Sequence, residues 1–417
     1  MTRMNNETDN SRSPDLPAAS LRGGRTGQGR VLILAALWAA LLFMPACKRY
    51  SDIAEAPPAP AVQAVATGEF LDASGEALDA AALAGLLSRA EYILVGESHP
   101  SACDHEAQAR VIELMASAGA APAVGLEMVS LDRQPSLELF NKGILGVDQL
   151  EAELDWGRTW GYPFEVYRPI FEAARRHNLP LFALNAPRDI ARKVGKAGLK
   201  GLSIKERLGL PSKIIPVSKD QERDLRKVFD AHPFGSAKDQ EAAWKRFVTV
   251  QALWDTTMAR RAVEARVETR RPVVIIAGSG HVERDWGIGL RLASFDPAAR
   301  RILIMPWRGG DKPDPADAQA FFHCPEVKRP RLGLTLETVE QGIKVVAVAD
   351  GSRAEAAGIR PGDILVQAQG ADVRALADLH AATLKALGED GLLRLDILRG
   401  GEPVTVTIHL PVPGQGS

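Results

Sequence analysis

The residues YILVGESH (Tyr92–His99) combine a short apolar run with a glycine, a carboxylate and an imidazole that follow it at once. The same order recurs in AVGLEM (Ala123–Met128) and in VVIIAGSGH (Val273–His281). Each apolar run has the length of one buried strand. In an open parallel sheet, the carboxyl ends of the strands line a crevice in which ligands bind. The sequence therefore predicts one site formed by four side chains: Glu97, His99, Glu127 and His281.

Strands and helices alternate along residues 68–310, which predicts an α/β domain with a parallel sheet flanked by helices. The expected strands are Tyr92–Val95, Ala123–Leu126, Leu181–Leu184, Val273–Ala277 and Ile302–Met305. The expected helices are Ala107–Ala116, Phe164–His177, Asp220–Ala231 and Asp239–Arg266. The last two belong to a helical insertion over residues 203–269, and we expect it to form a lid over the crevice.

The first 47 residues resemble a bacterial lipoprotein signal. A basic region is followed by a short apolar run (Val31–Phe43) and then by Met44-Pro45-Ala46-Cys47. The apolar run is too short to span a bilayer comfortably. The resemblance implies lipidation of Cys47, and an uncleaved anchor is the alternative; in both cases we expect the body of the protein to lie outside the cytoplasm, tethered to a membrane. Residues 48–67 contain an Ala/Pro-rich stretch and are expected to be a flexible linker.

Composition narrows the class of protein. The chain has 417 residues, a formal net charge of −1 and no basic stripe, which argues against a nucleic-acid partner. With Cys47 assigned to the lipid, Cys103 and Cys324 remain, and they can pair in an oxidising compartment. Whether they do is left open by the sequence.

A second domain is expected over residues 329–412, after a Gly/Pro/Asp-rich linker at 311–328. Its segments RLGL (Arg331–Leu334), AEAAG (Ala354–Gly358) and IRPGDIL (Ile359–Leu365) resemble those of a PDZ domain. The resemblance implies that an extended or C-terminal peptide binds by adding a strand to an exposed sheet edge. The residues expected to bind this peptide are Leu332, Gly333, Leu334, Leu379 and His380.

The chemistry of the first domain leaves two interpretations open. Two carboxylates and two imidazoles suit either a divalent metal or an acid/base pair, and His105 on the next helix adds a third imidazole. The alternative is a structural role, in which these groups only form hydrogen bonds between loops at the end of the sheet.

A cluster of aromatic residues suggests a different kind of site, a haem pocket. Residues Trp156–Tyr167 (WGRTWGYPFEVY) hold two tryptophans and two tyrosines, and Trp254 and Met258 lie in the insertion. Flat apolar walls with a tyrosine or histidine ligand are what a haem pocket requires. The alternative is that these rings belong to the core.

Several motifs together resemble the ChaN-like haem-binding lipoproteins. They are GExH, His105 with Gln108, GLEM, Trp156 and Trp160 with Tyr167 and Pro169, Leu181–Arg188, Leu253–Ala259, AGSGHV and Gly287–Leu292. The resemblance implies an outer-membrane lipoprotein, facing the periplasm, that binds haem for iron uptake or storage, with haem shared in a homodimer. The implied iron ligand is Tyr167 or Tyr162. The remaining expected haem contacts are His99, His105, Trp160, Trp254, Met258 and His281.

The same layout is also similar to that of erythromycin esterase-like hydrolases and TraB/Tiki metalloproteases. That resemblance implies an alternative function, a hydrolase or protease dependent on zinc, manganese or a similar metal. Glu97 or Glu127 would then activate water. The metal ligands would come from the set Glu97, His99, Glu127 and His281.

Overall fold

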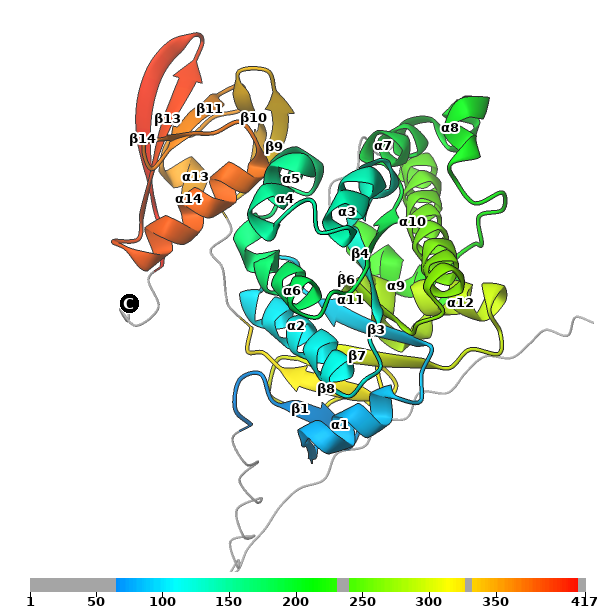
Figure 1. Ribbon diagram of the computed structural model, residues 1–417. Coiled ribbons are helices and arrows are strands. Elements are labelled where there is room, and N and C mark those ends of the chain that lie inside the picture. Colours follow the sequence, from blue (N-terminus) through cyan, green and yellow to red (C-terminus); the bar gives the residue numbers. More distant parts are fainter. Residues whose placement is uncertain (1–64, 231–239, 327–331, 412–417) are drawn as a thin grey trace, which may run out of the picture. The chain divides into compact units, whose positions relative to one another are not determined.

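The computed structural model describes residues 65–230, 240–326 and 332–411 (Figure 1). The first domain is built on an eight-stranded sheet with the order β2-β1-β8-β7-β3-β6-β4-β5. Its central strands are β3 (Tyr92–Glu97), β4 (Ala123–Ser130), β5 (Leu181–Asn185), β6 (Val273–Gly278) and β7 (Arg301–Trp307), all parallel. The predicted α/β fold class and its five parallel strands are therefore confirmed.

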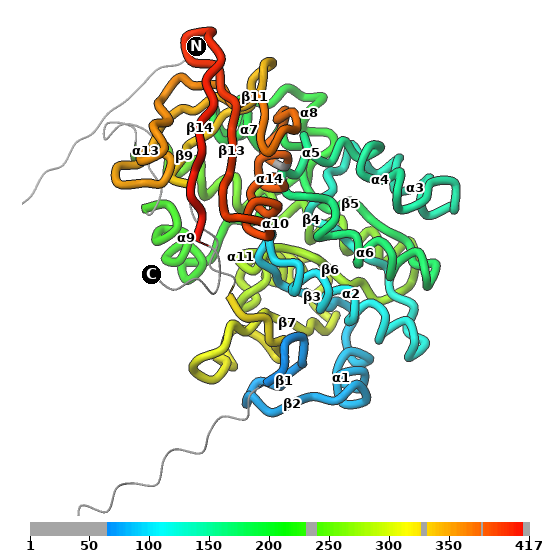
Figure 2. Tube along the Cα trace, turned by 90° about the vertical axis from the view of Figure 1, so that its left-hand side faces the viewer, coloured from blue at the N-terminus to red at the C-terminus, as the bar shows by residue number. Residues whose placement is uncertain are grey.

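Helices cover both faces of this sheet, because successive side chains of each strand point to opposite faces. Ile93 and Val95 of β3 pack in one core, with side chains of α1 (Ala80–Leu87), α2 (Ala102–Ser117) and α6 (Phe164–Arg176). Helices α2 and α6 lie side by side on that face (Figures 1 and 2). Tyr92 and Leu94 pack in the other core, with side chains of α10 (Gln240–Thr269) and α12 (Ile288–Phe295).

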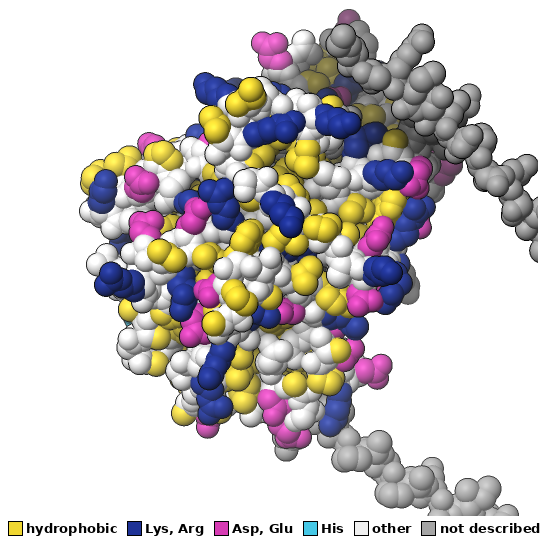
Figure 3. All heavy atoms as spheres, turned by 90° about the vertical axis from the view of Figure 1, so that its right-hand side faces the viewer, with side chains coloured by type: hydrophobic (Ala, Val, Ile, Leu, Met, Phe, Trp, Pro, Cys, Tyr) yellow, Lys and Arg dark blue, Asp and Glu magenta, His cyan; other side chains and the backbone are white. Residues whose placement is uncertain are grey.

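Shorter helices complete this domain. They are α3 (Gln134–Asn141), α4 (Val147–Glu153), α5 (Trp156–Thr159), α7 (Arg188–Ala197), α8 (Ile204–Leu208), α9 (Lys219–Asp230) and α11 (Ser279–Val282). On the face shown in Figure 3, basic and acidic side chains are interspersed, as the small net charge of the chain leads one to expect.

The sheet extends beyond the part that the sequence predicts. β8 (Ala320–His323) pairs parallel to β7, while β1 (Phe70–Asp72) pairs antiparallel to β8 and to β2 (Ala77–Leu78). Residues 311–328, expected to be a linker, therefore contain a strand of the first domain. These three strands are two to four residues long, which is too short for a recognisable hydrophobic period.

The lid expected from the insertion 203–269 describes only part of it. Helix α10 is a core helix along much of its length, since Met258, Ala259 and Ala262 are fully buried against the sheet. Its N-terminal half carries the residues that face the cavity described below. None of the helices among the described residues is long and apolar enough to cross a membrane.

The second domain is an antiparallel sheet with its own core, as predicted. The order is β14-β13-β11-β10-β9, and β12 pairs with β11. The elements are β9 (Leu334–Val339), β10 (Gly342–Val348), α13 (Arg353–Ala356), β11 (Ile364–Ala368), β12 (Ala371–Asp372), α14 (Leu376–Gly388), β13 (Leu392–Arg399) and β14 (Glu402–His409). Ile343, Leu365 and Ile397 are buried in its core. β9 lies at one edge of the sheet, the position that strand addition by a peptide requires.

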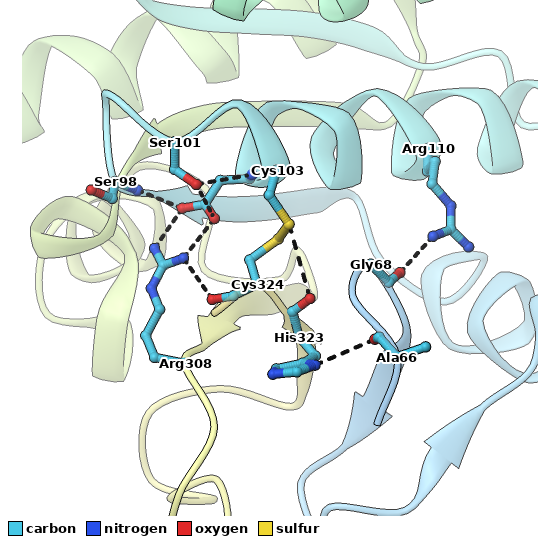
Figure 4. The surroundings of a disulfide bond; sticks show 10 residues. Ala66, Gly68, Ser98, Ser101, Cys103, Arg110, Arg308, His323 and Cys324 are labelled. Atoms are coloured by element: carbon cyan, nitrogen blue, oxygen red, sulfur yellow. Dashed lines mark hydrogen bonds and ion pairs between the residues drawn. A yellow bond between two sulfur atoms is a disulfide. The ribbon is translucent and has the colours of Figure 1, made fainter. Parts of the chain in front are cut away.

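A disulfide bond joins Cys103 on α2 to Cys324, just after β8 (Figure 4). Beside it, the buried carboxylate of Asp104 accepts hydrogen bonds from Arg308 at 2.7 and 2.6 Å and from the backbone N–H of Ser98 at 2.8 Å. Disulfide and ion pair together fasten the start of α2 to the segments that directly follow β8 and β7. The loop that carries His99 ends at this helix.

Candidate functional site

The structure brings together the four strand-end side chains. Glu97 is the last residue of β3 and His99 follows it; Glu127 belongs to β4, and His281 lies in α11, directly after β6. β6 lies between β3 and β4 in the sheet, so all four side chains leave the same end of three neighbouring parallel strands. The order of the strands, which the sequence does not show, is what makes them neighbours.

Glu97 is the centre of a buried polar cluster. Its Oε1 lies 2.8 Å from His99 Nδ1 and accepts a hydrogen bond of 2.8 Å from the hydroxyl of Tyr167. Its Oε2 lies 3.1 Å from Nε2 of the buried His105. Burial alone would raise the pKa of Glu97, but the charges and hydrogen bonds of His105 and His99 outweigh it and hold this pKa well below its usual range.

A second pair joins an imidazole to a carboxylate on the other side of Glu127. His281 Nδ1 lies 2.6 Å from Asp255 Oδ1, and His281 Nε2 lies 3.5 Å from Glu127 Oε1. The other Glu127 oxygen accepts a 2.6 Å hydrogen bond from the N–H of Gly278. Burial disfavours the charged imidazole, but the negative charges of Glu127 and Asp255 raise the pKa of His281 to about 9.

Asp255 is held in place by two further buried side chains, which the sequence did not point to. Gln221 Nε2 donates to Asp255 Oδ2 at 2.9 Å, and Arg291 Nη1 lies 3.4 Å from the same oxygen. Arg291 also donates to Gln221 Oε1 at 2.8 Å, and burial lowers its pKa. The available signal for Asp255 was its place in the motif LWDTTMA (Leu253–Ala259), where it is the charged residue. Arg291 carries a comparable signal, since it is a charged residue in the apolar motif Gly287–Leu292, whereas Gln221 carries none.

Gly278 makes the close approach of His99 possible. A Cβ atom at this position would lie 2.7 Å from His99 Cε1 and 3.1 Å from His99 Nε2. Its backbone angles are ordinary (φ −56°, ψ 143°), so space rather than conformation requires glycine here.

Chemically, the site consists of two imidazole–carboxylate pairs, Glu97–His99 and Asp255–His281, with Glu127 between them. Such pairs can hold or transfer protons. A metal centre gains no support. Among the described residues, the side chains close enough to share an ion are Cys103, Asp104 and Cys324, and two of these are joined in the disulfide.

A cavity of about 940 Å³ opens next to Glu127, within the ordinary range of ligand pockets, roughly 300–1,000 Å³. It lies between one face of α7 and one face of α10, above the ends of β4 and β5. Its lining is aromatic, aliphatic and basic: Glu127, Met128, Ser130, Thr159, Trp160, Asn185, Ala186, Arg188, Ala191, Arg192, Gly195, Ala243, Arg246, Phe247, Val250, Gln251 and Trp254.

The expected haem contacts differ in where they lie relative to this cavity. Trp160 and Trp254 line this cavity, and their rings lie 4.8 Å from His99 and 6.2 Å from His281, respectively. Tyr162 lies 5.3 Å from the ring of His99, and Tyr162, His99 and His281 are not among the residues that line the cavity.

Tyr167, Met258 and His105 are instead fully buried and do not line the cavity. The hydroxyl of Tyr167 is bound to Glu97 and lies 3.1 Å from the carbonyl oxygen of His99, so its expected role as an iron ligand does not fit this placement. Burial and the charge of Glu97 raise its pKa well above the usual value, which disfavours the tyrosinate.

The expected peptide-binding residues lie at two places in the second domain. Leu332 and Gly333 precede β9, which begins at Leu334. Gly333 has φ +81°, and a Cβ there would lie 2.2 Å from the side chain of Ser352, so this loop requires glycine. On α14, His380 is half-buried, whereas Leu379 packs in the domain core and not on a peptide-binding surface.

Comparisons with known proteins agree with this architecture. The family model described as haem-binding uptake, Tiki superfamily, ChaN matches residues 83–292, and a PDZ model matches residues 330–410. No curated protein matches the chain.

Three solved structures are similar to parts of the chain. ChaN of Campylobacter jejuni, titled for cofacial haem binding, is 19% identical over 61% of this chain and 95% of that chain, with a TM-score of 0.49. The type III effector HopBA1 is 12% identical over 60% and 94%, with a TM-score of 0.32. The HtrA3 PDZ domain bound to a phage-derived ligand is 26% identical over 20% and 86%, with a TM-score of 0.18. By the family match over half its length, the chain belongs to the haem-binding ChaN family, and it also carries a PDZ domain.

Proposed function

We propose that this protein holds haem in the cavity between α7 and α10, and that it does so as a lipid-anchored protein of the cell envelope, for haem uptake or storage. The observation that carries the proposal is the lining of that cavity. Trp160, Trp254 and Phe247 offer flat apolar walls, and three arginines offer positive charge. A haem group has a flat apolar ring and two carboxylates, so the residues present fit it in both respects.

The aromatic and the basic residues of the cavity would have different roles in binding. The aromatic rings would pack against the macrocycle and exclude water, while Arg188, Arg192 and Arg246 would pair with the carboxylates. Bound haem supplies an iron centre that the chain itself does not provide. The raised pKa of His281 favours its protonated form, which lies 3.5 Å from the carboxylate of Glu127 and would offset its charge.

A titration of the purified full chain with haem, followed by absorbance, tests this function. Binding should shift the Soret band. Trp254→Ala should raise the Kd for haem by roughly tenfold, since a large stacking surface is lost. Trp286→Ala is the matched control, because Trp286 lies outside the cavity lining. An unshifted Soret band with the wild-type chain would refute the proposal.

The envelope location has its own support and test. The lipoprotein-like segment 1–47 lies outside the described residues, but the Cys103–Cys324 disulfide favours an oxidising compartment. In cells, the wild-type chain should sediment with membranes and incorporate labelled fatty acid, and Cys47→Ser should abolish the label. Label retained in Cys47→Ser would contradict lipidation at this residue.

The remaining parts of the proposal concern partners. The PDZ domain is proposed to bind the C-terminal or an extended segment of another protein along β9. Two copies of the chain are proposed to share haem. Light scattering with and without haem tests the second point, since a mass that stays at that of one chain in both cases would contradict it.

A further inference from the structure

The faces of α7 and α10 that line the cavity are regular. On α7 the lining residues recur every three or four positions: Arg188, Ala191, Arg192 and Gly195. On α10 they recur in the same way: Ala243, Arg246, Phe247, Val250, Gln251 and Trp254. This spacing is that of a single helix face. The cavity therefore lies between two helix surfaces, and both surfaces supply arginine.

The charge of this lining is unbalanced. Arg188, Arg192 and Arg246 face one carboxylate, that of Glu127. Arg246 Nε donates to the carbonyl of Gly195 at 2.9 Å, which ties this side chain to the opposite helix, and Arg188 Nη1 donates to the carbonyl of Arg158 at 2.6 Å. Each of these bonds uses one of the five N–H donors of a guanidinium group. The cavity is thus suited to a ligand with more than one negative charge.

The same lining is poor in ligands for iron. Haem iron is held in proteins by His, Cys, Met or Tyr. Among the described lining residues only Met128 is of these types, and it is 3% exposed. The tyrosine expected as ligand is bound to Glu97, and neither His99 nor His281 is among the residues that line the cavity.

These observations lead to an inference that rests on the proposed haem function and refines it. The geometry points to a cavity that recognises the porphyrin ring and its two carboxylates rather than the metal. The ligand class is then dicarboxylate porphyrins, with or without iron. Stacking on Trp160, Trp254 and Phe247 does not depend on the metal, and neither does pairing of the carboxylates with arginine.

The test titrates the full chain with three probes: haem, metal-free protoporphyrin IX and protoporphyrin IX dimethyl ester. Quenching of tryptophan fluorescence reports binding of each probe. We expect haem and the metal-free porphyrin to bind with Kd values within about threefold, and the ester to bind at least about tenfold more weakly, because it lacks charge for the arginines.

Any other binding result refutes one identifiable statement. Binding of haem without binding of the metal-free porphyrin would overturn this inference and leave the proposed haem function standing. Equal binding of the ester would overturn the role of the carboxylates. Binding of none of the three would refute the proposed function itself.

Two double variants test whether Arg192 and Arg246 bind the carboxylates of the porphyrin. Arg192→Gln with Arg246→Gln should weaken both carboxylate probes by about tenfold and leave the ester unchanged. Lys193→Gln with Lys245→Gln is the control, since these lysines are the chain neighbours of the two arginines and instead pair with Glu206 and Glu241. Equal weakening in both double variants would overturn the assignment. Melting temperatures of all variants check that each is folded.

Discussion

The imidazole of His281 shows how one residue depends on carboxylates from two other elements. Asp255 on α10 holds its Nδ1, and Glu127 on β4 faces its Nε2. The ring is only 12% exposed, so water does little to weaken these charges. The pKa of about 9 follows from that arrangement.

This raised pKa predicts that the protein loses stability as pH rises. Between about pH 6.5, the ordinary pKa of histidine, and about pH 9, the folded chain keeps a proton that the unfolded chain has released. The unfolding free energy should fall across that window by at most about 3 kcal/mol. Urea unfolding at pH 6, 7.5 and 9 measures the fall. His281→Gln should flatten it in part, and a variant with the slope of the wild type would contradict the assignment.

Gly278 gives a second prediction for a single residue. Gly278→Ala should destabilise the fold by about 1–3 kcal/mol, because the new Cβ would displace the ring of His99. Gly280→Ala is the control, since nothing lies within 4 Å of a Cβ at that position. Denaturant unfolding compares the two. Equal losses in both variants would mean that the close approach to His99 is not the cause.

Residue by residue, the sequence predicted the part of the site that belongs to strand ends. Glu97, His99, Glu127 and His281 each follow or end an apolar run, and parallel strands present such positions at one edge. Asp255 escaped prediction as the partner of His281 because it lies on a long helix of the insertion, and no pattern shows which strand end that helix approaches.

At the scale of elements, strand length separates what the sequence predicted from what it did not. β3 and β6 have six residues each and are buried throughout, so their apolar runs are easily recognised. β8 has four residues and returns to the sheet after a Gly/Pro-rich stretch that indicates a linker. The lid expectation failed for the C-terminal half of α10 for a related reason. This helix mixes polar and apolar residues around its circumference, and only packing shows that its C-terminal half is core.

Helix α2 gives a prediction about covalent support. Cys103→Ala with Cys324→Ala should lower the unfolding free energy by roughly 2–4 kcal/mol, since the bond closes a loop between residues 221 positions apart. Denaturant unfolding measures the loss. Reducing the wild-type chain should give a similar loss, while adding reductant to the double variant should change nothing. A double variant as stable as the oxidised wild type would contradict this role.

At the scale of the whole molecule, the described residues form separate hydrophobic cores. The core of the PDZ domain shares no residue with the cores on the two faces of the larger sheet. Each domain therefore has its own source of stability.

Two domains with separate cores predict two unfolding transitions. Ile397→Ala, at a fully buried position of the PDZ core, should cost about 2–5 kcal/mol and lower one transition temperature only. Ile276→Ala in β6 should lower the other. Differential scanning calorimetry distinguishes them. A single transition that shifts as a unit in both variants would show that the domains unfold together.

The bond between Cys103 and Cys324 has a practical consequence for the handling of this protein. A single proteolytic cut anywhere between the two cysteines leaves both fragments covalently attached. Nicked and intact chains should then run at nearly the same mass on a denaturing gel until a thiol is added. Limited digestion of this protein is therefore informative only when each sample is loaded twice, with and without dithiothreitol.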